Sequence, residues 1–153
     1  MQAYADWIYS HKAYVMWFHA AHHLSKGSGF AGDHVNLYGK IYADMAETFD
    51  GVVERVLGLT DDETMACPNH IAVGASSKLQ AYGLIPNQPD ISIAAAALDA
   101  NKKYLEYLGA MVSNLKQTNS ISIGTEDFVA GICNQLEEYN YLLQQRIKIT
   151  ISQ

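Results

Sequence analysis

The sequence predicts an all-α domain built mainly from four long helices. In four long segments, apolar residues recur at intervals of three and four, the spacing that places them on one face of an amphipathic helix. Polar breaks that contain glycine or proline separate these segments. The chain has 153 residues, a length that fits one hydrophobic core, so we expect a single domain over residues 1–153.

The first predicted helix spans residues 3–25 and ends at the polar break 26–29, because glycine often follows the last turn of a helix. The second begins at Asp33, whose side chain is a favourable N-cap, and reaches about residue 57. Its expected buried stripe consists of Leu37, Ile41, Met45, Thr48, Val52 and Val56.

Residues 58–89 are less regular than the segments on either side. Thr60 and Glu63 have the spacing of a capping box for a short turn, and we expect a small helix over residues 71–82. Asp90 is the expected cap of a third long helix, which reaches about residue 116.

A fourth long helix is expected after the polar loop 117–120. Thr125 is its expected first residue and residue 148 its approximate end. The expected stripe consists of Phe128, Ile132, Leu136, Tyr139 and Leu143. Residues 147–152 alternate like a β-strand, but we expect a frayed end there because a lone strand has nothing to pair with.

The lengths of the connections indicate a topology. Short connections join the first helix to the second and the third to the fourth, whereas a long one separates the second from the third. A long connection of this kind runs from one end of the helices to the other in ferritin-like four-helix bundles. We therefore expect a ferritin-like four-helix bundle with a long crossover that carries a short helix.

Composition and charge exclude several classes of function. The formal net charge is −6 with 10 basic residues, and Lys102–Lys103 is the only adjacent basic pair, so direct DNA binding is not expected. No targeting segment and no membrane-spanning apolar run are visible. Cys67 and Cys133 are too few for a disulfide framework and fit a reducing compartment, so we expect a cytoplasmic protein.

Histidines cluster at the end of the first predicted helix. His19, His22 and His23 are three and four residues apart, so they project over one side of the helix. Neutral imidazole is a good ligand for iron, zinc or copper. One interpretation is therefore a metal site, with zinc bound by these three histidines as one version of it. The other is a set of polar residues that only form hydrogen bonds.

A pair of acidic residues lies late in the second predicted helix. Asp50 and Glu54 are four residues apart and therefore lie on one face. Two such carboxylates repel each other unless a cation or solvent separates them. The pair is thus either a set of cation ligands or a solvated pair beside Arg55.

Taken together, these residues form a longer pattern. The run His19-x-x-His22-His23-x-x-Lys26-Gly27-x-x-Phe30-x-x-x-His34, followed by Asp50-x-x-x-Glu54-Arg55, resembles the DNA-protection-during-starvation (Dps) mini-ferritins. The resemblance is strongest over residues 17–57 and extends as a pattern over nearly the whole chain.

The resemblance implies a site and an activity. His22 and His34 would be iron ligands from one subunit, Asp50 and Glu54 would come from a two-fold-related neighbour, and His19 would lie close by. The implied activity is oxidation of Fe(II) by peroxide or oxygen, with ferric iron sequestered in a shell. The implied partners are further copies of the chain, in a homodimer interface within a homododecamer.

The chain also departs from the family pattern. Tyr38 stands where the family has a helix-B acid, and His23 replaces a tryptophan. One residue more than usual separates His34 from Asp50, which requires a π-bulge or a shift of register within the helix. Asp44 and Glu47 are nearby substitute ligands if the register shifts.

These departures leave a second hypothesis open. It is a ferritin-like helical bundle without a working metal site, which acts as a structural or interaction oligomer.

Overall fold

The computed structural model describes residues 1–87 and 91–148, and every regular element in these ranges is helical. The prediction of an all-α chain is therefore confirmed for the described residues. The expected cap at Asp90 and the alternating residues 149–152 lie outside these ranges. None of the described helices is long and apolar enough to cross a membrane.

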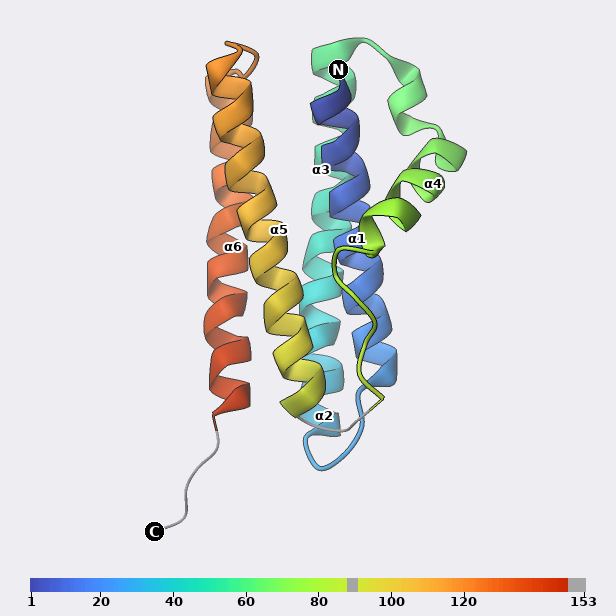
Figure 1. The fold of residues 1–153 in the computed structure, drawn as a ribbon, viewed down its shortest axis with the longest axis vertical. Helices are drawn as coiled ribbons and strands as arrows, with labels where there is room; N and C mark the ends of the chain where they lie inside the picture. Colours follow the sequence, from blue (N-terminus) through green and yellow to red (C-terminus); the bar gives the residue numbers. More distant parts are fainter. Residues whose placement is uncertain (88–90, 149–153) are drawn as a thin grey trace.

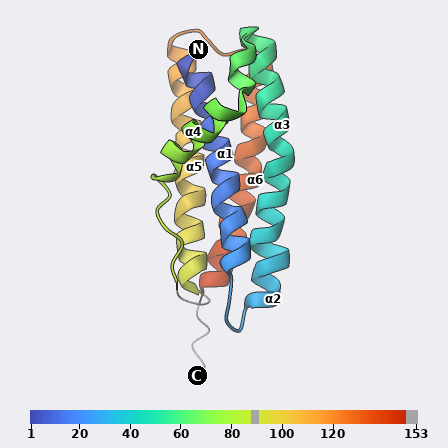
Figure 2. The same ribbon diagram turned by 90° about the vertical axis from the view of Figure 1, so that its right-hand side faces the viewer.

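Four long helices lie side by side in the described chain (Figures 1 and 2). They are α1 (Gln2–Leu24), α3 (Lys40–Thr60), α5 (Ile91–Gln117) and α6 (Ile123–Ile147). Helices α1 and α6 run in one direction, and α3 and α5 run in the other (Figure 1). Because α3 and α5 are parallel, the chain between them returns along the length of the long helices.

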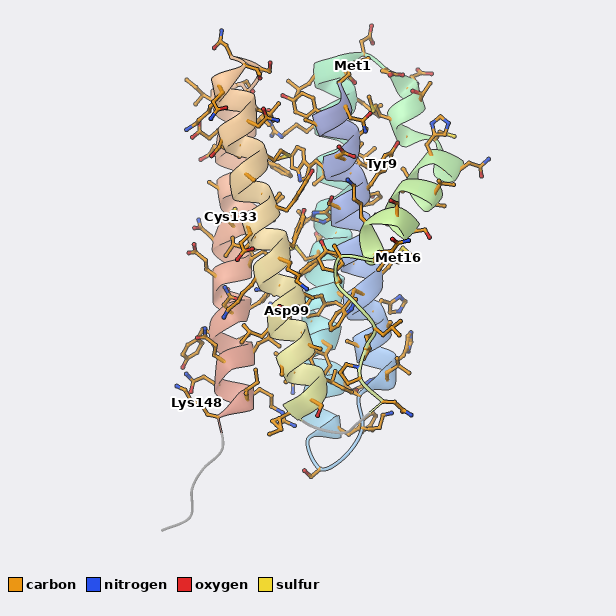
Figure 3. All side chains as sticks on the ribbon, viewed as in Figure 1. Met1, Tyr9, Met16, Asp99, Cys133 and Lys148 are labelled. Atoms are coloured by element: carbon orange, nitrogen blue, oxygen red, sulfur yellow. The ribbon has the colours of Figure 1, made fainter. Side chains whose placement is uncertain are left out.

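Shorter elements complete the described chain. The π-helix η1 (Asp33–Gly39) lies between the single turn α2 (Phe30–Gly32) and α3. The 3₁₀-helix η2 (Glu63–Ala66) and helix α4 (Pro68–Leu79) lie between α3 and α5. Helix α4 packs on α1, the helix that carries Tyr9 (Figure 3). A Cβ at Gly74 of α4 would overlap the Tyr9 ring.

The helix starts differ from three sequence expectations. The second helical segment begins at Phe30, and Asp33 does not cap it, because the Asp33 carboxylate is buried and pairs with Arg146 of α6. Ser122, not Thr125, caps α6 and accepts a hydrogen bond from the backbone N–H of Thr125. Asp62, not Thr60, caps η2 through the backbone N–H of Thr64.

The expected helix over residues 71–82 begins three residues earlier, at Pro68. Proline suits the first turn of a helix because that turn has no use for its missing N–H. Both cysteines are free thiols, with Cys133 on α6 (Figure 3) and Cys67 just before α4.

A chain of polar side chains crosses the middle of the core. His11 of α1 is fully buried, with Nδ1 2.6 Å from the Tyr104 hydroxyl and Nε2 2.8 Å from the Met45 carbonyl oxygen. Because a carbonyl oxygen only accepts, His11 Nε2 carries the proton, and Tyr104 donates to Nδ1. This network fixes α1 against α3 and α5.

Asn101 of α5 extends the polar network to α6. It accepts a hydrogen bond of 2.6 Å from the Tyr14 hydroxyl and donates to the Leu136 carbonyl at 2.7 Å. The same amide nitrogen donates to Asn140 at 2.8 Å. Buried polar groups that are all satisfied in this way favour one register of the helices over its neighbours.

Candidate metal centre

His22 and His34 form a stacked pair where α1 ends and η1 begins. Their ring centroids are 3.8 Å apart and the ring planes are inclined by 13°. His22 Nδ1 hydrogen-bonds to the His34 carbonyl oxygen, and His34 Nδ1 to the His22 carbonyl oxygen at 2.7 Å. The structure therefore brings together the two histidines that the sequence assigns to one subunit.

These reciprocal hydrogen bonds determine which nitrogen of each ring carries the proton. A carbonyl oxygen can only accept, so both Nδ1 atoms carry hydrogen when the rings are neutral. Both Nε2 atoms then present a lone pair, which is the form that binds a metal ion. Histidine ligands are commonly held in this way, with the second ring N–H donated to a backbone carbonyl.

The segment that carries His34 is an irregular helix. A π-helix, the first of the two alternatives considered for the spacing between His34 and Asp50, is present over Asp33–Gly39. Whether the register matches the mini-ferritin pattern stays a prediction. A π-turn is wider than an α-turn, and here the His34 carbonyl is reached by the His22 side chain.

Gly39 is the residue of η1 that faces the histidine pair. A Cβ at this position would overlap the His34 carbonyl oxygen and lie 2.9 Å from His22 Nδ1. Its backbone angles, φ −61° and ψ −44°, are ordinary helical values. Space, not conformation, therefore favours glycine here. Tyr38, the neighbouring residue of η1, is fully buried in the core.

His19 and His23 lie next to this pair on the exposed side of α1. Their Nε2 atoms are 3.0 Å apart, and the His19 ring stacks on Tyr42 of α3 with centroids 4.2 Å apart. Desolvation lowers the pKa of His19 below its usual value, and the positive charge that His23 and His22 would carry lowers it further. The neutral, metal-binding form is favoured as a result.

Asp50 and Glu54 are exposed on α3, at some distance from the histidines of the same chain. Asp50 lies sixteen positions after His34, which corresponds to roughly 24 Å along a helix. Both acids line a hollow of about 270 Å³, together with Ala66 and Ile71. Within residues 1–87 and 91–148, no three His, Cys, Asp or Glu side chains of one chain are close enough to hold a metal ion. A site shared between two subunits stays a prediction.

Asp44, the first of the two substitute ligands, is engaged elsewhere. It accepts a hydrogen bond of 2.8 Å from Tyr139 of α6 and pairs with Lys40 at 2.5 Å. Glu47 lines the same shallow pocket as Asp44, between α3 and α6. Neither residue belongs to the His22–His34 pair.

Sequence reasoning missed the buried polar network around His11. Burial lowers the pKa of His11 to about 4, although its hydrogen bond to the Met45 carbonyl opposes the shift. This network could have been suspected from the sequence, because His11 and Asn101 fall within helical stripes of otherwise apolar residues. A polar residue at such a position has to find buried partners.

Comparisons with known proteins give no match. No family model matches the chain, and neither the curated proteins nor the solved structures include one that is significantly similar to it. The function of this site therefore has to be inferred from its own residues and geometry.

Proposed function

We propose that this protein is an iron-binding mini-ferritin of the Dps type, which oxidises Fe(II) with peroxide or oxygen and sequesters the ferric product. The observation that carries the proposal is the His22–His34 pair, in which both Nδ1–H groups donate to backbone carbonyls. In the neutral rings both Nε2 atoms are thereby left unprotonated, which is the form that binds a metal ion, and the hydrogen bonds restrict the rings before any ion arrives.

The proposed site is completed by Asp50 and Glu54 of the partner subunit in a two-fold dimer. The two acids are exposed on α3 and do not reach the histidines of their own chain. A two-fold axis that brings α3 of one subunit against the α1–η1 corner of the other would create two equivalent sites. His19 would lie at the edge of each one.

The proposed fold is a ferritin-like four-helix bundle, and the proposed assembly is a homododecamer in the cytoplasm. The parallel course of α3 and α5, with the connecting segment along the bundle, supports this fold (Figure 2). The free thiols and the net charge of −6 suit a reducing compartment and a cationic cargo.

The donor set suits ferrous iron as a substrate. Imidazole binds Fe(II), and carboxylates favour the Fe(III) product because their charge offsets the added positive charge. In the peroxide reaction, two Fe(II) ions each give up one electron. The O–O bond breaks, two protons are taken up, and two waters leave. Zn(II) is the expected competitor, because imidazole binds it as well.

The proposal is tested by following ferric absorbance after Fe(II) and peroxide are mixed with the protein. We expect His34→Ala to slow the reaction by about tenfold or more, because it removes a ligand and a partner of His22. His70→Ala is the matched control, since His70 is exposed on α4, away from the pair. Equal rates for His34→Ala and the unmodified protein would refute the site.

A mixing experiment tests whether the site is shared between subunits. One chain carries His22→Ala and His34→Ala, and the other carries Asp50→Ala and Glu54→Ala. Each parent is expected to be inactive, while each mixed dimer regains one intact site. Random mixing should therefore restore about a quarter of the original activity. No recovery, with mixed dimers detected by native mass spectrometry, would contradict a shared site.

A structural or interaction oligomer without a metal site is the second candidate. It is favoured by Gly39 and Tyr38, because neither offers a carboxylate to the histidine pair. An assembled oligomer that binds neither Fe(II) nor Zn(II) in equilibrium dialysis would support this candidate over the first.

A further inference from the structure

We propose that His19 and His23 form a second metal site, separate from the iron site, which takes a late divalent transition-metal ion, Cu(II) above all and Ni(II) next. The two residues are one turn apart on α1, and both side chains are exposed to solvent. Within residues 1–87 and 91–148, neither side chain hydrogen-bonds to the backbone, in contrast to His22 and His34.

The distance between the two nitrogens matches a chelate. His19 Nε2 and His23 Nε2 are 3.0 Å apart. Two imidazole nitrogens that each lie roughly 2.1 Å from one metal ion, at that separation, subtend an angle of about 90°. An angle of this size corresponds to neighbouring positions in a square or tetragonal complex, the geometry that Cu(II) and Ni(II) prefer, whereas Zn(II) favours a wider tetrahedral angle.

The protonation of the pair can adapt to a bound cation. Two lone pairs at this distance repel each other, so in the absence of metal one Nε2 must carry a proton and donate it to the other. A metal ion can replace that proton once the donating ring moves its hydrogen to Nδ1. Both rings stay neutral, and both lone pairs then point at one ion.

The surroundings hold the pair in place and leave room for the remaining ligands. The His19 ring is stacked on Tyr42, with the planes inclined by 19°, and the helix backbone sets the spacing of one turn. Less side-chain entropy is lost on binding when one ring is already ordered. Because both histidines are exposed, water can fill the other coordination positions.

The choice of Cu(II) follows from the ligands. For a site made of nitrogen donors and water, affinity among the divalent ions rises to a maximum at copper. Two neutral imidazoles bring no charge of their own, so the site discriminates against hard ions such as Mg²⁺ and Ca²⁺, which require oxygen ligands. The copper site shares His19 with the edge of the proposed iron site, but its second ligand, His23, is not among the proposed iron ligands. The copper proposal can therefore be tested without the iron proposal.

The test is titration of the purified, metal-free protein with Cu(II) alone, read by calorimetry and by electron paramagnetic resonance. We expect two nitrogen ligands per copper, and His23→Ala should reduce them to one and raise the Kd by about tenfold or more, because the second imidazole binds intramolecularly. The titrations use a His22→Ala, His34→Ala background, because the His22–His34 pair would otherwise compete for Cu(II). Within this background, His70→Ala should leave both values unchanged.

A second variant keeps the number of histidines constant. In His23→Ala combined with Leu24→His, the imidazole moves about 100° around α1, so it no longer faces His19. Leu24 is exposed, and circular dichroism should show an intact fold. This variant should bind Cu(II) as weakly as His23→Ala.

Two results would overturn the proposal: unchanged Cu(II) affinity when His23→Ala is added to this background, or absence of the two-nitrogen signal from the background itself. Fe(II) oxidation by His23→Ala separates the two sites, since the iron proposal requires it to stay at the level of the unmodified protein.

Discussion

Replacement of Gly39 by alanine tests whether the π-helix and the His22–His34 pair depend on each other. In an ordinary helix interior, Gly→Ala stabilises a protein by about 1 kcal/mol, and the backbone angles of Gly39 would permit it. Here the new Cβ would overlap the His34 carbonyl oxygen and lie 2.9 Å from His22 Nδ1. The backbone of η1 or the His22 side chain must therefore move.

The cost of that movement exceeds the gain in helix propensity. Crowding a well-packed site costs about 1–3 kcal/mol, and loss of the hydrogen bond from His22 to His34 costs about 1 kcal/mol more. After the gain from alanine is subtracted, we expect a net loss of about 2 kcal/mol. For a chain of this size, that corresponds to a Tm lower by roughly 4–8 °C.

The same substitution at Gly109 is the matched control. Gly109 lies within α5, and a Cβ there would meet no atom within 4 Å. We expect Gly109→Ala to raise the stability by up to about 1 kcal/mol. Urea unfolding of both variants at one protein concentration, followed by circular dichroism, gives the comparison. A Gly39→Ala protein as stable as Gly109→Ala would refute the reasoning.

Three further predictions concern the core, and urea unfolding measures each of them. The unfolded chain protonates His11 near its usual pKa of 6.5, whereas the folded chain resists until about pH 4. Stability should therefore fall by up to about 3 kcal/mol as the pH drops from 6.5 to 4, and His11→Gln should abolish that slope. Arg146→Met should lower the free energy of unfolding by about 3 kcal/mol, because it leaves the buried Asp33 carboxylate without its guanidinium partner. An unchanged free energy of unfolding would contradict this. Asn101→Leu should lower the free energy of unfolding by about 2–3 kcal/mol, because the buried Tyr14 hydroxyl and Leu136 carbonyl lose their hydrogen-bond partner. A more stable variant would refute this account.

The four long helices could be predicted from the sequence because each carries a long, regular apolar stripe. Their observed ends lie within a few residues of the expected ones where a polar break follows directly, as at the end of α1. The starts were harder to predict, because several residues of suitable type compete within a few positions. Asp33 has the chemistry of an N-cap, but Arg146, which is 113 residues away, binds its carboxylate.

The histidine pair was predictable in part. The resemblance to mini-ferritins implied that His22 and His34 belong to one site, and the spacing before Asp50 implied either a π-bulge or a shift of register, of which a π-helix is observed. The sequence could not show that the Nδ1 atom of each histidine hydrogen-bonds to the backbone carbonyl oxygen of the other. It also could not show that Gly39 leaves the space for this contact. Both depend on how two helices approach each other, which local patterns do not encode.

The absence of a carboxylate at Gly39 has a consequence for the number of iron ions that the proposed site takes. The site would carry two negative charges, both from Asp50 and Glu54 of the partner subunit, because the histidines are neutral. The negative charges of two carboxylates balance the two positive charges of one Fe(II) ion. A second Fe(II) ion would add two positive charges close to the first ion, with no carboxylate to balance them. We therefore expect one Fe(II) per chain in an anaerobic titration. Gly39→Asp is no remedy, because its Cβ would meet the same obstruction.

Peroxide accepts two electrons, so one ion per chain requires that the second electron come from another site. The two sites of a two-fold dimer can each supply one, or a single site can turn over twice. In either case the ferric product should amount to two ions per peroxide, while the anaerobic stoichiometry stays at one Fe(II) per chain. Binding of two Fe(II) per chain, with both lost in Glu54→Ala, would show that the charge argument is wrong even if the site itself is right.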